Sequence, residues 1–431
     1  MATYKIAWMP GDGTGRDVMD AARLVLDAIG FDAEYIPADI GWEFWCSEGD
    51  ALPPRTIDIL KKTDCALFGA ITSKPKDEAA DELAPQLQDK GLSYFSPIVK
   101  LRQLLNLHTN LRPCKAYAGN PLNFRDDIDL VVFRENTEGM YGGVEFHPLP
   151  QSVFDALCLN PKMKKFGDKG LENLALSTRI MSRQGCRSIV RQAFEYAKKH
   201  GRKSVTLVEK PNVLRETGGL MTRVAREVAD HYPDIPLWET NIDAMCMWLV
   251  RKPQEYDVLV AENMFGDIIS DLAAGLVGGL GFASAANIGD DYAVFEPTHG
   301  SAPKYAGQYK VNPTAMLLTV KLMFDWLGEK ELAQRLEHAV ATVIREHKVG
   351  TYDVGLGNTT LEVAEEVGLD TDRLVEDMKD PAIEAAIIAN ADLARALGIT
   401  GTPTFVVGDQ LHPGALDIKT LRALIERQRT G

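Results

Sequence analysis

The chain lacks the features that mark secreted, membrane-spanning or nucleic-acid-binding proteins. Its six cysteines are scattered with no CxxC pair among 431 residues, which argues for reduced thiols rather than a disulfide framework. No apolar run is long enough to span a bilayer, and no basic-then-apolar signal opens the sequence. The net charge of −14 excludes the basic footprint that non-specific nucleic-acid binding needs. We therefore expect a cytoplasmic protein that binds neither membranes nor nucleic acids.

What the chain contains is an alternation of strand-like and helix-like segments. Its composition, 45% hydrophobic and 25% charged, is that of a globular protein, and its length allows two or three domains. The alternation predicts an α/β fold. We expect strands at residues 4–9, 65–69, 129–134, 204–209 and 258–261, helices at 16–29, 98–105, 317–327, 332–346 and 360–366, and irregular structure or an arm at 118–150.

The stretch of residues 256–313 carries the most chemistry. After the strand expected at 258–261, a helix would place Asp267 and Asp271 four residues apart, on one face. Such a pair is more commonly a solvated helix face, but hard oxygen ligands on a rigid element suit Mg²⁺ or Mn²⁺. A glycine-rich run and the small-residue loop 299–307, with a His and a Lys, follow the helix. Together they favour a metal and a phosphate-bearing cofactor.

Residues 10–15, with the sequence PGDGTG, join the first expected strand to the first expected helix. They superficially resemble a dinucleotide fingerprint, but the third glycine comes one residue too early for GxGxxG. Tight turns explain individual glycines at least as well. We therefore predict no Rossmann site here.

Three arginines, Arg102, Arg112 and Arg134, form the candidate anion site. Any one of them alone is more commonly a surface or ion-paired residue. Guanidinium groups bind carboxylates bidentately, so that three together suit a di- or tricarboxylate. Tyr141 follows Arg134 closely and becomes a candidate proton donor if a cation such as Lys210 lowers its pKa.

Taken in order, these motifs resemble those of one enzyme family. PGDGTG, SPIVKLR, NLRP, RENTEGMY, EKPNV, NID, GDIISD and HGSAPKYAG are similar to segments of the metal-dependent β-decarboxylating dehydrogenases, which include isocitrate, 3-isopropylmalate and homoisocitrate dehydrogenases. The resemblance covers residues 4–366. It implies a non-Rossmann α/β fold of the isocitrate/isopropylmalate dehydrogenase type, in which two domains share one large sheet. It also implies a homodimer with composite active sites, to which Lys210 and Asp243 come from the neighbouring subunit.

The resemblance further implies a domain division. Residues 1–114 and 256–370 would form a large cofactor-binding domain. Residues 115–255 would form a small domain with a dimer-forming arm.

The resemblance assigns roles to individual residues. Lys210 would take the substrate hydroxyl proton while a hydride passes to the nicotinamide, and Tyr141 would protonate the enolate that remains after loss of CO₂. The substrate would be bound by Ser96, Ile98, Arg102, Arg112, Arg134 and Asn212. Mg²⁺ or Mn²⁺ would be held by Asp243, Asp267 and Asp271. The cofactor would be bound by Glu296, His299, Gly300, Ser301, Ala302, Lys304, Tyr305, Asn312, Tyr352, Asp353 and Lys252.

The cofactor positions favour NADP over NAD. Lys304 and Tyr305 are similar to the pair that NADP-dependent isocitrate dehydrogenases set against the 2′-phosphate, whereas NAD-dependent members usually place an Asp and an apolar residue there. Tyr352 and Lys252 fit the same preference. Leu356 departs from it, since an arginine is expected at that position.

Two residues of the segment expected to bind the substrate, Ser96 and Ile98, favour different substrates. Ser96 matches the serine with which isocitrate dehydrogenases bind the γ-carboxylate, but Ile98 stands where those enzymes usually carry an asparagine. An apolar residue at that position resembles isopropylmalate and homoisocitrate enzymes and favours a less polar substituent. We predict isocitrate as substrate, with 3-isopropylmalate or homoisocitrate as the alternative. A non-catalytic regulatory subunit is a further alternative, against which the intact set of metal, lysine and tyrosine residues argues.

Residues 375–431 differ in character and predict an appended module. Their sequence resembles the C-terminal part of DsbA-like thioredoxin folds, in which the Thr402-Pro403 bond would form the cis-proline turn. Because the CxxC half of that fold is absent, we expect no dithiol redox chemistry. The module is too small for a full core, so we expect it to pack on the body or on a neighbouring subunit. Its expected elements are helices at 380–397 and 418–428, a strand at 404–407 and a hairpin-like turn at 408–413.

Overall fold

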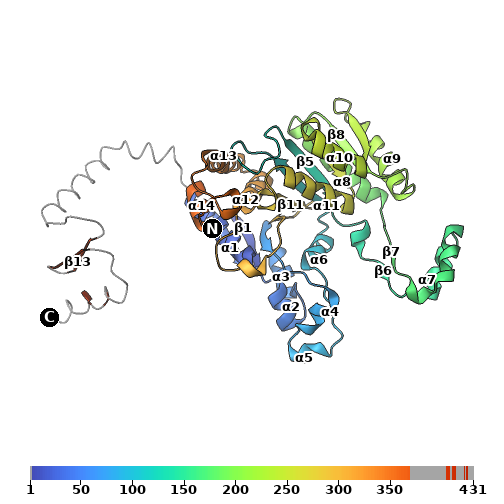
Figure 1. The fold of residues 1–431 in the computed structure, drawn as a ribbon, viewed down its shortest axis with the longest axis horizontal. Helices are drawn as coiled ribbons and strands as arrows, with labels where there is room; N and C mark the ends of the chain where they lie inside the picture. Colours follow the sequence, from blue (N-terminus) through green and yellow to red (C-terminus); the bar gives the residue numbers. More distant parts are fainter. Residues whose placement is uncertain (1, 369–403, 408–409, 414–421, 423, 426–431) are drawn as a thin grey trace. The chain divides into compact units, whose positions relative to one another are not determined.

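One mixed sheet of ten strands organises the first 368 residues (Figure 1). The computed structural model describes residues 2–368, 404–407, 410–413, 422, 424 and 425, and the chain divides into two units at residue 368. The strand order is β2-β1-β3-β12-β11-β4-β5-β10-β8-β9. The bounds are β1 (Tyr4–Gly11), β2 (Ala33–Pro37), β3 (Cys65–Ala70), β4 (Thr109–Lys115), β5 (Asp129–Glu135), β8 (Val205–Glu209), β9 (Leu237–Asn241), β10 (Val258–Ala261), β11 (Ser284–Ile288) and β12 (Ala293–Pro297).

The sheet is parallel towards both edges and antiparallel in the middle. Strands β2, β1, β3 and β12 pair in parallel, as do β5, β10, β8 and β9. Between these halves β12, β11, β4 and β5 pair antiparallel. This mixed sheet confirms the predicted α/β class, and all the strands expected in this part of the chain are present.

Helices cover both faces, which explains why the strand at 258–261 is apolar at every position. Val258 and Val260 belong to the core under one set of helices, and Leu259 and Ala261 to the core under another. The first set includes α1 (Thr14–Ala28), α8 (Arg183–Lys199), α9 (Thr217–Ala229), α12 (Thr314–Leu327), α13 (Lys330–Glu346) and α14 (Thr360–Gly368). The second comprises α10 (Ile242–Arg251) and α11 (Asn263–Leu276).

Short helices lie beside the sheet between β2 and β4, and most of them were not expected from the sequence. The expected helix at 98–105 is present as α6 (Pro97–Leu104). The others are α2 (Trp42–Glu48), α3 (Pro54–Leu60), α4 (Lys76–Asp81) and α5 (Pro85–Gln88).

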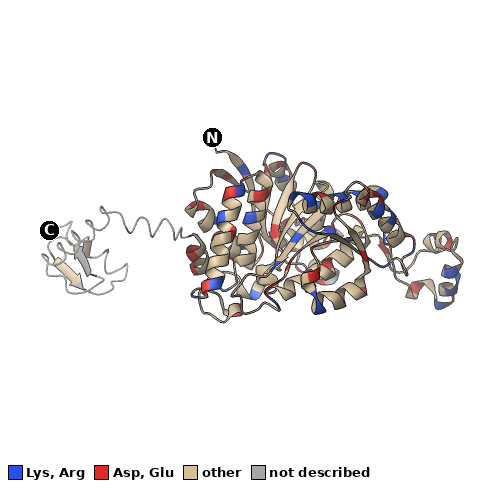
Figure 2. Cartoon of the chain, turned by 90° about the horizontal axis from the view of Figure 1, so that it is seen from above, with Lys and Arg blue, Asp and Glu red and all other residues tan. Residues whose placement is uncertain are grey.

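The expected arm is longer and more ordered than the sequence indicated. Irregular structure was expected at 118–150, but the arm continues through helix α7 (Gln151–Leu157) and a 3-10 segment η2 (Pro161–Lys169). The short strands β6 (Glu145–Phe146) and β7 (Leu176–Ser177) pair antiparallel at its base. Both Figure 1 and Figure 2 show this arm extending away from the sheet.

The division of this unit into two domains stays a prediction. The sheet places β10 between β5 and β8, which belong to the segment expected to form the small domain, although β10 itself was assigned to the large one. No helix of the described residues is both long and apolar enough to cross a membrane.

The second unit contains one described hairpin. Strand β13 (Thr404–Val407) confirms the expected strand and pairs antiparallel with β14 (Gln410–Pro413). The segment 408–413 was expected to be a hairpin-like turn, and its residues 410–413 are corrected to a strand. Of the helix expected at 418–428, the described residues Arg422, Leu424 and Ile425 are helical. The helix expected at 380–397 and the Thr402-Pro403 bond lie outside the described residues.

Candidate active site

A row of polar residues crosses three neighbouring strands in the middle of the sheet. The strand register pairs Asn110 on β4 with Arg134 on β5 and with Asn287 on β11. Residues that are directly opposite in a sheet point to the same face, so that the three side chains lie together. Asn110 Nδ2 donates to Asn287 Oδ1 at 2.7 Å, and all three residues are at most 2% exposed.

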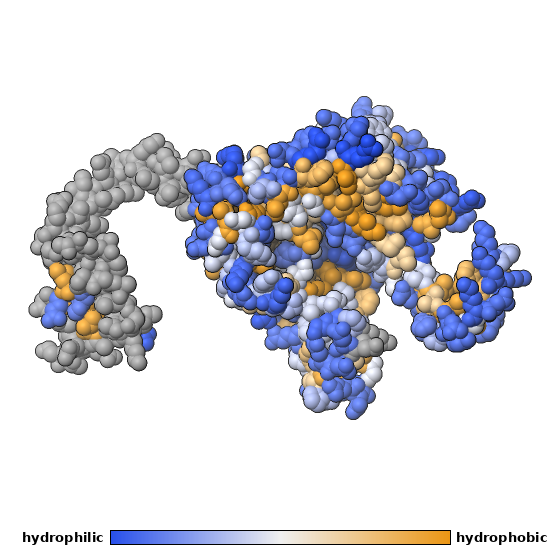
Figure 3. Space-filling model, viewed as in Figure 1, coloured by the Kyte–Doolittle hydropathy of each residue, from blue (hydrophilic) through white to orange (hydrophobic). Residues whose placement is uncertain are grey.

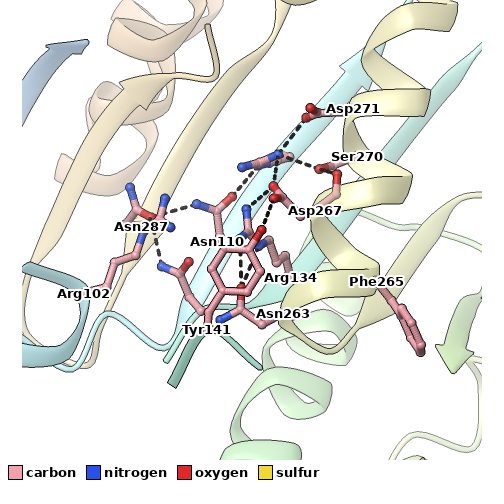
Figure 4. A network of polar contacts seen from close by, with 12 residues as sticks. Arg102, Asn110, Arg134, Tyr141, Asn263, Phe265, Asp267, Ser270, Asp271 and Asn287 are labelled. Carbon is pink, nitrogen blue, oxygen red and sulfur yellow. Dashed lines mark hydrogen bonds and ion pairs between the residues drawn. The ribbon is translucent and has the colours of Figure 1, made fainter. Parts of the chain in front are cut away.

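Helix α11 covers this row and brings its own polar side chains to it (Figure 4). Arg134 donates to Asn263 Oδ1 from Nε at 3.1 Å and from Nη2 at 2.9 Å, and it also donates to Asp267. Glu262, at the N-cap, accepts from the backbone N–H of Phe265 and so fixes the start of the helix. The first turn of α11 is thus locked to the end of β5.

Asp267 and Asp271 converge on one position, as their spacing predicted. The same Arg112 nitrogen, Nη1, lies 3.3 Å from Asp267 Oδ1 and 3.1 Å from Asp271 Oδ1. It also donates to Ser270 Oγ at 2.6 Å. The two carboxylates therefore share a cationic neighbour on one face of α11.

This arrangement fits a divalent cation that is completed by other ligands. Among the described residues no three His, Cys, Asp or Glu side chains form a closed metal site. Mg²⁺ commonly uses one or two protein carboxylates together with oxygens of the substrate, which matches the pair on α11. Asp267 and Asp271 would hold the ion, with the third predicted ligand, Asp243, lying elsewhere in this chain.

The two carboxyl groups have opposite electrostatic environments. Burial alone would raise the pKa of Asp267, but Arg134 and Arg112 outweigh it and hold that pKa below its ordinary value. Burial raises the pKa of Asp271, and the charge of Asp267 raises it further against the pull of Arg112. Asp267 is therefore the firmly ionised member of the pair.

Arg102, on α6, lines a cleft together with Arg112. Its Nε donates to Asn287 Oδ1 and its Nη2 to Glu296 Oε1, both at 2.9 Å. Glu296, predicted to bind cofactor, is therefore paired in this chain with a predicted substrate arginine. The cleft is lined by Phe68, Gly69, Ala70, Ile71, Arg102, Arg112, Glu296, Pro297, Thr298, His299 and Gly300.

Tyr141 lies beside Asp267 and Arg134. Its hydroxyl donates to Asp267 Oδ2 at 2.6 Å, and its ring centroid lies 5.0 Å from the Arg134 guanidinium carbon. Burial raises the pKa of Tyr141, and the hydrogen bond to Asp267 raises it further. The expected lowering by Lys210 is not found within one chain, because the ionised carboxylate beside the hydroxyl favours the protonated phenol.

Lys210 and Asp243 are paired with each other. Lys210 follows β8 and donates from Nζ to Asp243, which lies in the first turn of α10. This hydrogen bond holds the pKa of Asp243 below its ordinary value. Asp243 is largely exposed, and Asn212 is exposed on the loop after Lys210. The pair is thus presented on the surface of its own subunit.

Four residues were predicted to bind the 2′-phosphate, and three of them, Lys304, Tyr305 and Tyr352, lie together near the surface. Lys304 Nζ lies 4.7 Å from the ring centroid of Tyr305, and the rings of Tyr305 and Tyr352 are 6.2 Å apart. Lys252 lies apart from them at the end of α10, where it donates to Glu255 at 2.9 Å.

The other predicted cofactor residues lie on two loops. His299 lines the cleft, its Nε2 has no hydrogen-bond partner among the described residues, and burial lowers its pKa. Gly300, Ser301 and Ala302 follow it. On the second loop Asp353 accepts from Asn312 Nδ2 at 3.0 Å.

The two predicted specificity residues lie at the start of α6. Ser96 immediately precedes the helix and is partly exposed. Ile98 is 8% exposed and packs in the core cluster that contains Leu52, Leu60 and Phe68. A contact of either residue with substrate stays a prediction.

Sequence reasoning missed the amides that hold the arginines. Asn287 accepts from Arg102, Asn110 and Asn136, and it donates to Glu296 Oε1 at 2.7 Å. A buried asparagine between the apolar residues of a strand was the available signal, since buried polar groups need partners. The residues missed are Asn110, Asn136, Asn263, Ser270 and Asn287.

Comparisons with known proteins confirm the predicted fold of the isocitrate/isopropylmalate dehydrogenase type. The profile of the family described as isocitrate/isopropylmalate dehydrogenase matches residues 5–367. The 3-isopropylmalate dehydrogenase of Archaeoglobus fulgidus is 42% identical over 84% of this chain and 98% of its own length. A crystal structure of isocitrate dehydrogenase from Methylococcus capsulatus superimposes with a TM-score of 0.74 and 37% identity, covering 85% of this chain and 98% of that one.

A further relative is longer than this chain. Protein DlpA of Legionella pneumophila subsp. pneumophila is 40% identical over 84% of this chain. The chain spans only 58% of the length of DlpA.

The C-terminal resemblance is also confirmed. A profile described as a DSBA-like thioredoxin domain matches residues 321–426. The match begins within α12 and therefore overlaps helices whose buried residues belong to the core of the first unit. The appended segment accounts for its remainder.

Proposed function

The chain belongs to the isocitrate/isopropylmalate dehydrogenase family, and we propose that it oxidatively decarboxylates a 2-hydroxy acid whose C3 carries a second carboxylate. The observation that carries the proposal is the joining of three arginines at one site: Arg102 and Arg112 line one cleft, and Arg112 and Arg134 both contact Asp267 of α11. Three guanidinium groups at a buried site suit a ligand with two or three carboxylates.

The residues of the chain divide the work of the reaction. The arginines bind the carboxylates and orient the malate core, because each is held by an amide or carboxylate partner. Lys210 takes the proton of the 2-hydroxyl, and Tyr141 protonates the enolate left after loss of CO₂. When bound, the divalent ion would acidify the hydroxyl and stabilise the enolate, and NADP or NAD would supply the hydride acceptor.

A homodimer with composite sites accounts for the position of Lys210. The lysine pairs with Asp243 at the surface of its subunit rather than with Asp267. An apolar patch covers α10 and α11 (Figure 3), where Met247, Val250 and Ile268 are 44%, 47% and 48% exposed. Exposed apolar patches commonly mark protein interfaces. We propose that this surface faces the second subunit and brings Lys210 and Asp243 into the neighbouring site.

Two substrates have specific support. Ser96 favours isocitrate, through a hydrogen bond to the γ-carboxylate. Ile98 and the 42% identity to the 3-isopropylmalate dehydrogenase of A. fulgidus favour 3-isopropylmalate with equal weight. The apolar Ile98 is also compatible with homoisocitrate. A non-catalytic role has less support, since Tyr141, Lys210 and all three aspartates are present.

A substrate panel tests the proposed function. Isocitrate, 3-isopropylmalate and homoisocitrate would each be assayed with NADP and with NAD in the presence of Mn²⁺. We expect one acid to be preferred by at least about tenfold in kcat/KM, because a misfitted substituent loses contacts or leaves a polar group unpaired. EDTA should abolish turnover and added Mn²⁺ restore it. Full activity in EDTA would contradict the metal-dependent scheme.

The cofactor preference is proposed to be NADP. Lys304 lies beside Tyr305 and Tyr352 at the surface, where a cation would pair with a 2′-phosphate. Replacing Lys304 by Asp should lower the ratio of kcat/KM for NADP to that for NAD by roughly a hundredfold, since a carboxylate repels the phosphate. Lys252→Asp, the same charge change at the end of α10, tells whether that lysine also contributes. A wild-type enzyme with higher kcat/KM for NAD would overturn the preference.

A further inference from the structure

The loop proposed to bind the cofactor rests on the beginning of α1, the segment that superficially resembles a dinucleotide fingerprint. The backbone N–H of Thr14 donates to the carbonyl oxygen of Ser301 at 2.8 Å, and Thr14 Oγ1 donates to the same oxygen at 3.0 Å. Ser301 Oγ is hydrogen-bonded to Thr72 Oγ1 at 2.7 Å. Ser301 is therefore held on both its backbone and its side chain.

Asp17 holds the far end of the same loop. One turn into α1, its carboxylate accepts from the backbone N–H of Gly307 through Oδ1 and from that of Tyr309 through Oδ2, each at 3.0 Å. Asp17 is 2% exposed. A buried carboxylate that satisfies two backbone donors fixes their relative position strongly, because charge-assisted hydrogen bonds are stronger than neutral ones.

One residue of the loop between these anchors has an unfavourable backbone conformation. Ala302 has a φ of 35°, in the left-handed region that non-glycine residues seldom adopt. The surrounding structure must therefore hold it. Gly13 approaches so closely that a Cβ there would lie 2.2 Å from the carbonyl oxygen of Ser301. This contact explains a glycine at position 13 without any contact to a dinucleotide.

We propose that Asp17 is a positioning residue for cofactor binding, which holds the loop of residues 301–309 in its binding shape from α1. The proposal rests on the proposed function, since it takes this loop to be the NADP or NAD site. In this proposal the PGDGTG segment and α1 do not bind phosphate, as a dinucleotide fingerprint would. They support the cofactor loop through Thr14 and Asp17, and we call this support the brace.

Replacing Asp17 by Asn tests the brace with little change of shape. The amide keeps one oxygen but turns an NH₂ group towards one of the two backbone donors. We expect the Kd for NADP, measured by titration calorimetry with Mn²⁺ present, and the KM for NADP to rise roughly tenfold or more. At saturating NADP, kcat and the KM for the preferred acid should stay within about twofold of wild type, since the arginine cleft is untouched.

A matched control and a second variant secure the result. Asp27→Asn makes the same change at the exposed end of α1, where Asp27 pairs with Arg23, and should leave the Kd for NADP unchanged. Asp17→Glu keeps the charge but moves the carboxylate by one methylene, so it should also raise that Kd, which keeps the test valid if Asp17→Asn fails to fold.

The outcomes separate the two proposals. A folded Asp17→Asn enzyme with wild-type Kd for NADP would overturn the brace alone. The brace would also be overturned if kcat fell while the KM for the acid and the Kd for NADP rose by similar factors, because such changes would indicate a general structural role. A folded wild-type protein that binds neither NADP nor NAD would overturn the proposed function, and the brace with it.

Discussion

Replacing Tyr141 by phenylalanine is expected to lower kcat for oxidative decarboxylation by about 10²–10³-fold, the usual contribution of a general acid. The hydroxyl is the only group that this substitution removes. Its hydrogen bond to Asp267 and the high pKa of the phenol keep the proton on Tyr141 until the enolate forms. The ring over Arg134 remains, so that the substrate site keeps its packing.

The kinetics should show which step the phenol serves. Because hydride transfer precedes protonation of the enolate, the variant should give a rapid burst of reduced cofactor, about one equivalent per site, followed by slow turnover. Tyr232→Phe is the matched control, since that hydroxyl donates to Glu195 on α8 and should be dispensable for catalysis. Wild-type kcat in the Tyr141 variant would remove the acid assignment, and a slow first turnover without a burst would move the tyrosine to an earlier step.

The features that follow from local pattern were the ones the sequence could predict. The apolar run at 258–261 predicted β10, and the four-residue spacing of Asp267 and Asp271 predicted that both would face one position. Both depend only on the periods of a strand and a helix. The short helix α7 in the arm was missed because seven residues make only about two helical turns, too few for a helical period to stand out.

The amide row was beyond prediction for a different reason. Asn110 and Asn287 are 177 residues apart, and only the register of β4 against β11 places them side by side. A shift of one residue in that register would turn Asn110 to the opposite face of the sheet. The arginines could be predicted because their charge suits carboxylate binding. The asparagines that orient them could not, because their positions depend on which strands pair, and no local sequence pattern shows that.

Lys210→Ala and Asp267→Asn homodimers are each expected to lose about 10³-fold in kcat, yet a heterodimer of the two should recover about half the wild-type activity. In a composite site Lys210 acts on the substrate bound beside the partner's α11. One site of the heterodimer then combines an intact Lys210 with an intact Asp267, while the other site lacks both. The separation of the Lys210–Asp243 pair from Asp267 within one chain is the reason for this expectation.

Co-expression with two different tags allows the heterodimer to be purified and assayed. If Lys210 and Asp267 acted within one subunit, neither site of the heterodimer would be intact, and activity would stay at the level of the single variants. The heterodimer of Lys210→Ala with Asp243→Asn is the matched control. Because those two residues are paired on one subunit and would be donated together, each of its sites lacks one of them, and no recovery is expected. Recovery in the first heterodimer and none in the second would show that Lys210 and Asp243 cross the interface together.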